Sequence, residues 1–423
     1  MNYIKKNSQE EKELLERFLR YVKTYSESDS NKADEGIMPS TPQQRDFANM
    51  IAEEMKAAGL ENVHVTEFCY AYGVLPASEG FENVPPFCLL SHMDTVDEVS
   101  GKNVNPVVHE NYDGALIELA ETNPLDADSD EALAEAARER DTIITTDGHT
   151  LLGADDKAGI AAIMTAISYL KAHEEIKHGK IEVIFSPDEE TGHGMDKVPL
   201  ESIQSKRAYT VDGGHIGELE TECFNAVGTT VVFTGKSTHT GTARKAGMIN
   251  SIAMASHFVS SLPITERPET SDGTAGFYAP IEFTGTIEKS TVYLLLRDFD
   301  GENMKTRQKT VEALAEAAVL SFGGNAKVTH KTQYFNMKQK LDEHPEVVRD
   351  LEAAYRKAGV EPVFMPIRGG TDGSRLTEMG IPTPNIFTGG HNYHSRMEWA
   401  SLNQMCKAAD ILINLAGIIG TAN

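Results

Sequence analysis

The sequence predicts an α/β protein in which a mostly parallel central sheet carries an inserted second domain of the ferredoxin-like kind. Through about residue 220, apolar runs typical of buried strands alternate with segments of helical periodicity, an order typical of parallel sheets covered on both faces. From residue 222 to residue 335 the expected elements follow the order βαββαβ. We therefore expect one domain of residues 1–221 and 336–423 and a second of residues 222–335.

The elements of the first domain follow from periodicity and from residues that begin or end helices. In the helix expected at residues 42–59, Thr41-Pro42 is typical of a first turn and Gly59 of a helix end. The acidic, alanine-rich segment 121–141 is expected to be a solvated surface segment with a short helix. Further helices are expected at residues 8–24, 130–140, 155–170 and 345–358, and strands near residues 62–68, 70–76, 86–90, 181–185, 208–211 and 384–387.

The inserted domain is expected to contain longer strands and two helices. Since the chain returns to the first domain afterwards, Asp212 and His394 can meet at one edge of the same sheet although they lie far apart in sequence. The expected elements are strands at residues 224–234, 276–286, 291–298 and 326–335 and helices at residues 246–262 and 301–321.

Charge and hydropathy exclude several classes of protein. With 39 basic and 64 acidic residues, the formal net charge is −25, which argues against nucleic acid or an anionic membrane as a partner. No window approaches about 18 uninterrupted apolar residues, so no membrane span is expected. The polar run that follows Asn7 is unlike a secretion signal, and a cytoplasmic location is the expectation.

The four cysteines predict neither a disulfide framework nor a thiolate metal site. Cys69, Cys88, Cys223 and Cys406 lie far apart, and no C-x-x-C pair occurs. Reduced structural thiols are the better interpretation. Any zinc must then be held by nitrogen and oxygen.

Histidine, aspartate and glutamate residues recur in five short segments at points where an expected strand ends or a helix begins. In open α/β sheets such points present ligand-binding groups along one edge. Taken singly, each segment is as well explained as a turn or a helix cap. Together they predict one convergent metal site. The segments are residues 91–94, 153–157, 188–192, 211–214 and 392–394.

The order of these segments, with a βαββαβ insertion between them, resembles the M20 family of co-catalytic zinc exopeptidases. The resemblance covers nearly the whole chain and includes the longer motifs at residues 145–148, 151–157, 366–373 and 387–394. It implies a zinc-exopeptidase-like catalytic domain and an inserted lid domain. Within the family the motifs are most similar to those of the tripeptide aminopeptidases, which remove the N-terminal residue of tripeptides.

The resemblance also implies two zinc ions per subunit. One carboxylate, Asp155, is expected to bridge both ions, and the peptide bond between Asp155 and Asp156 is expected to be cis. Imidazole nitrogen and carboxylate oxygen are ordinary zinc ligands, and a catalytic site keeps one position open for water. His92 and Asp212 are expected to complete the ligand set of one ion, and Glu190 and His394 that of the other.

Three further residues are expected to serve catalysis. Glu189 is left over beside the ligand Glu190, and in the family this residue is the general base and later the general acid. Asp94 is expected to accept the free ring N–H of His92 and to fix its tautomer. His239 matches a family histidine that stabilises the oxyanion, in dimeric members often from the partner subunit, although as a lone histidine it is equally explained as a surface loop residue.

Three residues are candidates for binding the peptide substrate. Arg297 and Arg368 each offer a planar fork for a carboxylate, but Arg297 is as easily a salt-bridge partner at a strand end. Asn250 either lines the same pocket or begins a helix.

Other functions stay open from the residues alone. A related M20 dipeptidase, carboxypeptidase or aminoacylase shares the metal site and differs only in the substrate pocket. A catalytically silent peptide-binding protein with this fold is the non-enzymatic alternative, which the presence of Glu189 and every expected ligand disfavours. The expected partners are a small peptide substrate and, through the inserted domain, a second copy in a homodimer.

Overall fold

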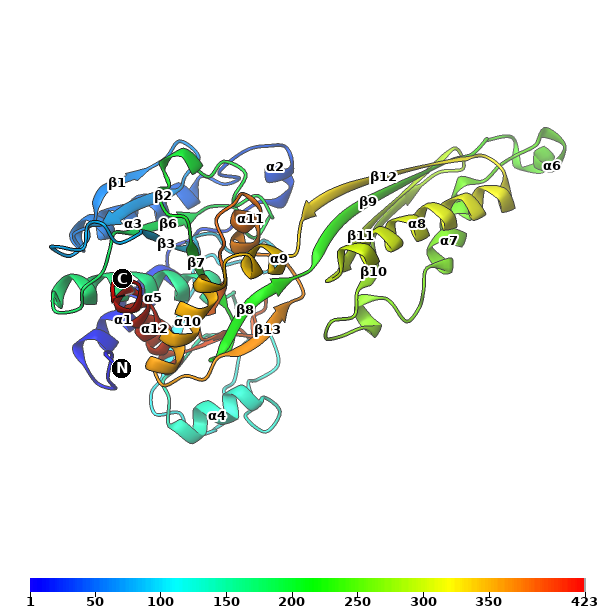
Figure 1. Cartoon of the computed structure of the whole chain (residues 1–423). Helices are drawn as coiled ribbons and strands as arrows, with labels where there is room; N and C mark the ends of the chain where they lie inside the picture. Colours follow the sequence, from blue (N-terminus) through cyan, green and yellow to red (C-terminus); the bar gives the residue numbers. More distant parts are fainter. Residues whose placement is uncertain (422–423) are drawn as a thin grey trace. The chain divides into compact units, whose positions relative to one another are not determined.

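The computed structural model describes residues 1–421, which fold into two compact units (Figure 1). Unit 1 comprises Met1–Thr221, Lys340–Met365 and the chain from Thr371 onward. Unit 2 comprises Glu222–Gln339 and Pro366–Gly370. The chain thus leaves unit 1 where expected and returns at residue 340, whereas residue 336 was expected, and the glycine-rich segment around Arg368 groups partly with unit 2.

Unit 1 is built on an eight-stranded sheet with strand order β1-β2-β6-β3-β7-β14-β8-β13. Its centre is parallel, since β3 pairs with β6 and β7, and β14 pairs with β7, in the parallel sense. Strands β2 and β8 flank this centre and are antiparallel to their neighbours. The parallel pairing of β6, β3, β7 and β14 confirms the predicted mostly parallel sheet. The strands are β1 (Glu61–Val65), β2 (Ala71–Leu75), β3 (Phe87–His92), β6 (Ile181–Ser186), β7 (Ala208–Gly213), β8 (Glu218–Cys223), β13 (Val363–Ile367) and β14 (Asn385–Phe387).

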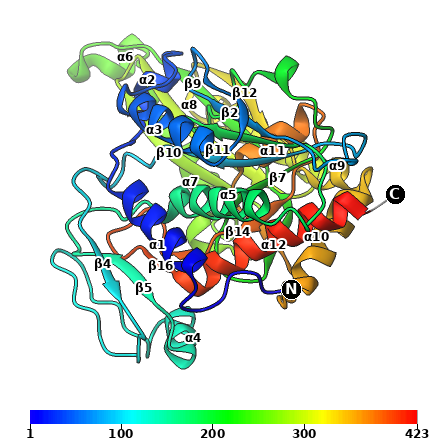
Figure 2. The ribbon, with the colours of Figure 1, turned by 90° about the vertical axis from the view of Figure 1, so that its left-hand side faces the viewer.

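Helix α5 (Ala154–Ala172) occupies the middle of unit 1, between the sheet and helices α1 and α12 (Figure 2). It packs on β3 and β7, and almost all of its residues as far as Ile167 are buried. Every residue of β3 and β6 is buried, as expected for central strands of a sheet that helices cover on both faces. The other helices of the unit are α1 (Gln9–Val22), α2 (Ser30–Asp34), α3 (Gln43–Ala57), α10 (Pro345–Lys357), α11 (Asp372–Glu378) and α12 (Leu402–Thr421).

A second, four-stranded sheet of unit 1, with order β15-β16-β5-β4, was not predicted. Part of the acidic segment expected to be solvated packs here, because Leu125, Leu133 and Ile143 form a buried cluster with Trp399. The pairing of β16 with β5 brings residue 399 beside residue 145. The elements are β4 (Pro106–His109), α4 (Glu131–Glu139), β5 (Ile143–Thr146), β15 (Gly390–His391) and β16 (Trp399–Ser401).

Unit 2 is an antiparallel four-stranded sheet with order β10-β11-β9-β12 and two packed helices, the βαββαβ arrangement that the sequence predicts. One helix differs from the expectation. The segment expected as one helix at residues 246–262 is divided, because Gly247 ends a short helix in the left-handed region and Asn250 caps the next one. The elements are β9 (Asn225–Thr234), α6 (Ala243–Ala246), α7 (Ser251–Ser261), β10 (Phe277–Gly285), β11 (Lys289–Asp298), α8 (Gly301–Phe322) and β12 (Asn325–Tyr334); α9 (Lys338–Asp342) follows at the return to unit 1.

Two expectations about the chain as a whole can be compared with the described residues. Among residues 1–421, no helix combines the length and the apolar character needed to cross a membrane. All four cysteines are buried.

Candidate metal centre

The five expected metal ligands meet at the carboxyl ends of the central parallel strands of unit 1. His92 is the last residue of β3, and Asp212 is the penultimate residue of β7. Glu190 lies in the turn that follows β6, which pairs with β3 in parallel. Asp155 stands in the first turn of α5, and His394 follows the short strand β15. The order of the chain and the parallel register therefore gather residues spread over some three hundred positions.

The two carboxylate oxygens of Asp155 face two different histidines. Oδ1 lies 2.9 Å from His92 Nε2, which is also 3.6 Å from Asp212 Oδ1. Oδ2 lies 3.4 Å from His394 Nε2, which is 3.2 Å from Glu190 Oε2. The group thus divides into two half-sites that share Asp155: the first contains His92 and Asp212, and the second contains Glu190 and His394.

The spacing of these donor atoms fits divalent metal ions. Ligands held at about 2.0–2.2 Å in a tetrahedron lie about 3.3–3.6 Å from one another. Three of the four distances within the half-sites are 3.2, 3.4 and 3.6 Å, and the fourth is 2.9 Å. Each half-site supplies one imidazole and two carboxylates, the nitrogen and oxygen donors that the absence of paired cysteines requires.

The charges of the centre are those of a site that binds cations. Burial raises the pKa of Glu190 to about 8, and the charge of Asp155 acts in the same direction. Burial likewise raises the pKa of Asp212 to about 6. For Asp155 burial acts upward too, but hydrogen bonds from His394 and His92 outweigh it and lower the pKa. Hydrogen bonds with Asp155 and Glu190 raise the pKa of His394 to about 11. Bound cations would relieve this crowding of carboxylates.

Asp94 joins the end of β3 to the loop that follows β6. Its carboxylate accepts the backbone N–H of Glu189 at 3.0 Å and that of Glu190 at 3.2 Å. The His92 ring contacts Asp94 as well, but its Nδ1 is 3.1 Å from the backbone carbonyl oxygen and 3.4 Å from the carboxylate. The carbonyl, rather than the expected carboxylate, is therefore the nearer acceptor for the ring N–H.

Glu189 stands beside Glu190 and outside both half-sites. Burial raises the pKa of its carboxyl well above the ordinary value, and the charges of Asp212, Asp372 and Glu190 act in the same direction while His92 opposes them. A raised pKa suits a group that takes up and releases a proton near neutral pH.

The remaining predicted residues all belong to unit 2. His239 is exposed and precedes a short 3-10 helix, where its Nδ1 accepts the Gly241 N–H. Asn250 caps α7 by accepting the Ile252 N–H at 2.9 Å. It therefore begins a helix, which was one of the two alternatives left open for this residue. Arg297 lies over the Tyr334 ring and donates to the carbonyl oxygen of Leu296.

Arg368 is engaged with backbone groups of unit 2. Its guanidinium donates to the carbonyl oxygens of Gly273 at 2.6 Å and Ala275 at 3.1 Å, and to Ser271. The same group lies over the rings of Phe224 and Phe277. In this arrangement Arg368 orders the chain around residues 271–275.

Two buried aspartates beside the ligands, Asp156 and Asp188, had no predicted role. The Asp156 carboxylate accepts from the Ser91 hydroxyl and from the His92 backbone N–H at 3.1 Å, and the preceding peptide bond is cis, as expected. The Asp188 carboxylate accepts from the Ser40 N–H at 2.8 Å and from Gln44 Nε2 at 2.6 Å. Adjacency to a ligand was the only signal for Asp156, and for the distant Ser40 and Gln44 there was none.

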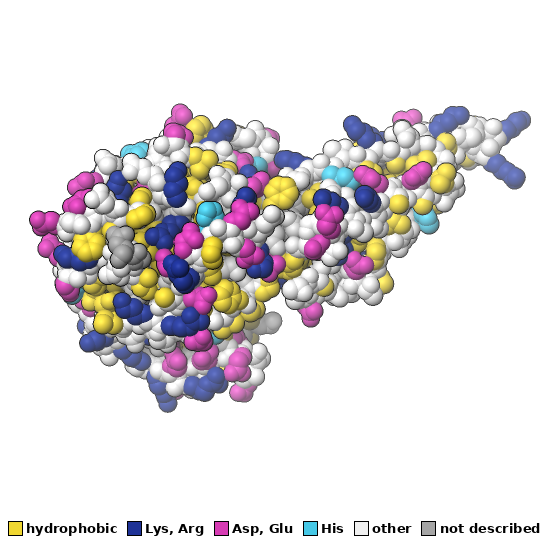
Figure 3. Space-filling model, viewed as in Figure 1, with side chains coloured by type: hydrophobic (Ala, Val, Ile, Leu, Met, Phe, Trp, Pro, Cys, Tyr) yellow, Lys and Arg dark blue, Asp and Glu magenta, His cyan; other side chains and the backbone are white. Residues whose placement is uncertain are grey.

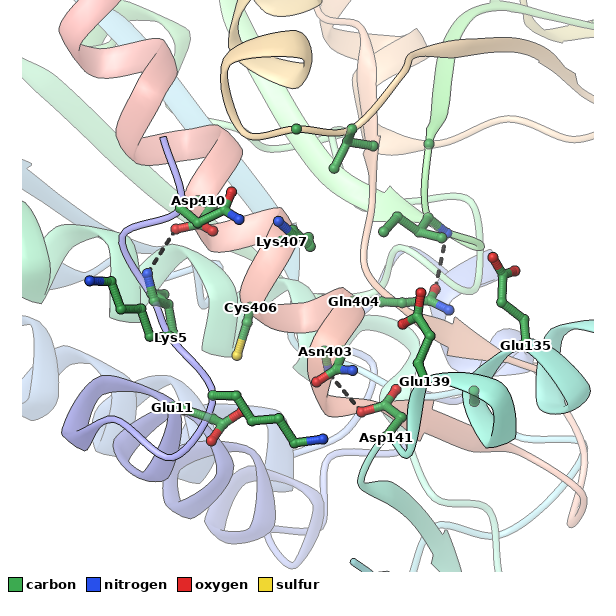
Figure 4. A pocket seen from close by; sticks show the side chains of 18 of the residues that line it. Lys5, Glu11, Glu135, Glu139, Asp141, Asn403, Gln404, Cys406, Lys407 and Asp410 are labelled. Carbon is green, nitrogen blue, oxygen red and sulfur yellow. Dashed lines mark hydrogen bonds between the residues drawn. The ribbon is translucent and has the colours of Figure 1, made fainter. Parts of the chain in front are cut away.

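A cavity of about 610 Å³ lies elsewhere in unit 1, beneath the N-terminal segment and beside α12 and α4 (Figure 4). None of the expected metal ligands lines it. Its buried acids already serve the fold, because Asp410 accepts the N–H groups of Tyr3 and Ile4 and Asp141 accepts those of Thr142 and Asn403. The convergent site at the sheet edge is therefore the better candidate for chemistry.

The sequence matches known peptidases over nearly its whole length. Residues 141–417 match the profile of peptidase family M20/M25/M40, and the chain belongs to this family. A curated relative from Clostridium perfringens (strain 13 / Type A), called Peptidase T, is 45% identical over 408 residues, which cover 96% of this chain and 99% of the relative. Peptidase T from Geobacillus thermodenitrificans (strain NG80-2) is also 45% identical, over 95% of this chain and 97% of the relative.

Solved structures share the fold. Aminopeptidase PepT from Bacillus cereus superposes with a TM-score of 0.75 at 22% identity, covering 97% of this chain and 98% of that chain. A tripeptidase from Staphylococcus aureus reaches a TM-score of 0.76 at 23% identity over the same shares. A dinuclear metal-binding peptidase of the M20 family from Bacillus subtilis reaches 0.65 at 14% identity, again over 97% and 98%. The fold of this chain thus recurs in solved peptidase structures.

Proposed function

We propose that this protein is a metal-dependent aminopeptidase that releases the N-terminal residue of tripeptides. The observation that carries the proposal is the pair of half-sites sharing Asp155, with one histidine in each. The near full-length identity of 45% to proteins called Peptidase T supports the substrate class. The proposed cofactors are two Zn²⁺ ions per subunit, held by His92, Asp155, Glu190, Asp212 and His394.

The proposed chemistry needs an electrophile and a base. When bound, the two zinc ions would lower the pKa of a water molecule and polarise the scissile carbonyl. The Glu189 carboxylate takes the proton from the attacking water and delivers it to the nitrogen of the leaving amine. Asp94 supports this role, because its carboxylate holds the backbone N–H groups of both Glu189 and Glu190.

Unit 2 is proposed to act as the lid and to supply groups that hold the substrate. His239 is the proposed donor to the oxyanion, and its exposed imidazole is free to take a partner beyond its own loop. Arg297, Arg368 and Asn250 are the proposed substrate-binding residues, although the contacts of Arg368 and Asn250 show that both also stabilise unit 2 itself.

A homodimer through unit 2 and a cytoplasmic location complete the proposal. The edge strand β10 exposes Ile281 and Phe283, and α8 exposes Leu320 and Phe322. Hydrophobic side chains lie among charged ones on the face of unit 2 seen in Figure 3. Exposed apolar groups of this kind favour association with a second copy. The strongly negative net charge argues against nucleic acid and membranes as partners.

A substrate panel tests the activity. The zinc-loaded protein is incubated with di-, tri- and tetrapeptides of alanine, each with a free or an acetylated amino terminus, and the released residues are identified. We expect fast release of the N-terminal residue from free tripeptides only, and a fall in kcat of about 10²–10⁴ in Glu189→Gln with unchanged zinc content.

Each alternative function gives a different result on the same panel. Preference for dipeptides, release from the carboxyl end, or cleavage of acetylated substrates would identify a related dipeptidase, carboxypeptidase or aminoacylase. Full zinc occupancy with tight peptide binding and no turnover on any substrate would identify the silent binding protein.

A further inference from the structure

Glu398 is a buried glutamate that belongs to neither half-site but contacts the backbone of Asp155, the residue that the half-sites share. The Glu398 side chain is 1% exposed. Its Oε2 accepts the backbone N–H of Leu152 at 2.9 Å and that of Gly153 at 2.7 Å, and its Oε1 accepts the N–H of Asp155 at 3.1 Å. One carboxylate thus accepts three backbone N–H groups of the segment that carries Asp155.

The N–H groups of Gly153 and Asp155 need an acceptor because α5 begins here. The first N–H groups of a helix have no partner within the helix, and a side chain at the cap position usually accepts one of them. The cap residue of α5 is Gly153, which has no side chain and adopts φ +79°. Glu398 therefore supplies from 243 residues away the acceptor that the local sequence lacks.

A buried lysine lies near the Gly153 end of this segment. The Lys157 side chain is 1% exposed, and its charge interacts with those of Glu398 and Asp94. Its Nζ lies beside Gly153, since a Cβ placed on that glycine would be 3.6 Å from it, and donates to the Thr24 carbonyl oxygen at 2.8 Å. The hydrogen bonds to the Glu398 carboxylate thus come from the backbone, and its charge favours the protonated form of Lys157.

Glu398 also belongs to the segment that carries His394. Between them, Ser395 accepts the Met397 N–H with its hydroxyl and the Glu398 N–H with its carbonyl. Directly after Glu398, β16 pairs with β5, so the segment is anchored to the small sheet of unit 1. The same residue therefore connects the loop of one expected ligand, His394, to the helix start of another, Asp155.

We propose that Glu398 is a positioning residue that fixes Asp155 relative to His394 and so sets the metal affinity of the half-site formed with Glu190. The proposal rests on the ligand set of the proposed function. Glu398 touches neither the metal nor the substrate; it acts through the backbone N–H of Asp155. Loss of such an outer contact typically weakens metal binding about 10–100-fold.

The test compares Glu398→Gln with Glu182→Gln. Glutamine keeps the size of the side chain but turns one acceptor into an amide that cannot accept an N–H. Glu182 is a matched control in the same unit, because it is buried and accepts the backbone N–H groups of Gln204 and Ser205 while contacting no expected ligand. Zinc per chain is measured by mass spectrometry of metals after dialysis, and zinc affinity by competition with a chelating dye.

We expect Glu398→Gln to keep a native circular dichroism spectrum, to retain close to one zinc ion per chain, and to bind the other about 10–100-fold more weakly. Its kcat should fall while KM stays near the wild-type value, whereas Glu182→Gln should retain two ions. Glu398→Asp, which keeps the charge but shortens the reach, should give an intermediate zinc affinity.

Two results would overturn the proposal. One is a folded Glu398→Gln that binds both ions with wild-type affinity. The other is that Glu398→Gln and Glu398→Asp are both unfolded while the control Glu182→Gln is folded. Glu398 would then be needed only for folding. The ligand set is tested separately by His394→Gln, because unchanged zinc affinity in that variant would refute the ligand assignment whatever Glu398 does.

Discussion

At the scale of single residues, the candidate centre depends on carboxylates that hold backbone groups as much as on those that face the histidines. Asp94, Asp156 and Asp188 accept backbone N–H groups from segments that are 64 or more positions away in the sequence. Buried acceptors of this kind keep a ligand's rotamer and distance within the narrow range that metal binding requires.

Asp94→Asn tests this interpretation. Asparagine has a single side-chain oxygen, so it can accept from Glu189 or from Glu190 but leaves the other N–H facing an amide. We expect kcat to fall about 10–100-fold with a small change in KM, because the base is displaced while the substrate pocket is not. Steady-state kinetics on a tripeptide measures this, and rates within twofold of wild type would contradict it.

At the scale of elements, helix α5 approaches the sheet closely enough to require glycine. A Cβ added at Gly159 would lie 2.0 Å from the Val211 carbonyl oxygen and 2.7 Å from the Ser91 hydroxyl. Those atoms belong to strands β7 and β3, which carry Asp212 and His92. Close contact between helix and strands therefore helps to set the spacing of the ligands.

Gly159→Ala is expected to destabilise the protein, although alanine normally favours a helix. The clash should cost on the order of 1–3 kcal/mol and exceed the gain of about 1 kcal/mol in helix propensity. Gly417→Ala in α12 is the matched control, since its new Cβ would meet only the Ile176 side chain at 3.6 Å. Urea denaturation of both variants measures the difference, and an equally stable Gly159→Ala would show that the helix can move away from the sheet.

Helix α12 holds the N-terminal segment through Asp410, and this contact should depend on pH. Burial raises the pKa of Asp410 to about 6 from 3.8, so ionisation of this group destabilises the fold. The destabilisation is absent below the pKa that Asp410 has in the unfolded chain. It grows as pH rises from that pKa to the pKa in the folded protein, and above the latter it is complete. Asp410→Asn keeps an oxygen for the Tyr3 and Ile4 N–H groups and carries no charge.

The stability of Asp410→Asn relative to wild type should therefore increase between pH 5 and pH 8, by on the order of 1 kcal/mol. Urea denaturation at the two pH values gives this difference directly, and any constant effect of the new amide cancels. If the stability of Asp410→Asn relative to wild type stays constant or decreases with pH, ionisation of Asp410 does not destabilise the fold.

At the scale of the whole molecule, metal binding should be coupled to stability, because the carboxylates of the centre lie together in the interior of unit 1. Free zinc at one hundred times its Kd should stabilise the folded state by about 2.7 kcal/mol per site. Thermal denaturation with excess zinc and with a chelator measures the shift in Tm. In Asp155→Asn the shift should largely disappear, and an equal shift in both proteins would place the zinc elsewhere.

Local patterns in the chain were enough to predict the α/β class, most helices and strands, and the order of the segments that form the centre. Helical and strand periodicity, a Thr-Pro helix start and the βαββαβ order depend on neighbours a few positions apart, so they can be read without coordinates. The family resemblance added the expected pairing of His92 with Asp212 and of Glu190 with His394. Their roles as ligands stay a prediction, which the zinc measurements above address.

Tertiary packing alone decided which distant groups support those residues. Glu398 meets the start of α5 across 243 positions, and Ser40 meets Asp188 across 148, because sheet pairing and helix packing bring together segments that no short-range pattern connects. The unpredicted small sheet has the same origin, since it depends on pairing between distant segments, whereas the split helix at Gly247 follows from the local residues Gly247 and Asn250. Periodicity reports which face of a segment is buried, whereas the partner on that face is selected only when the chain is folded.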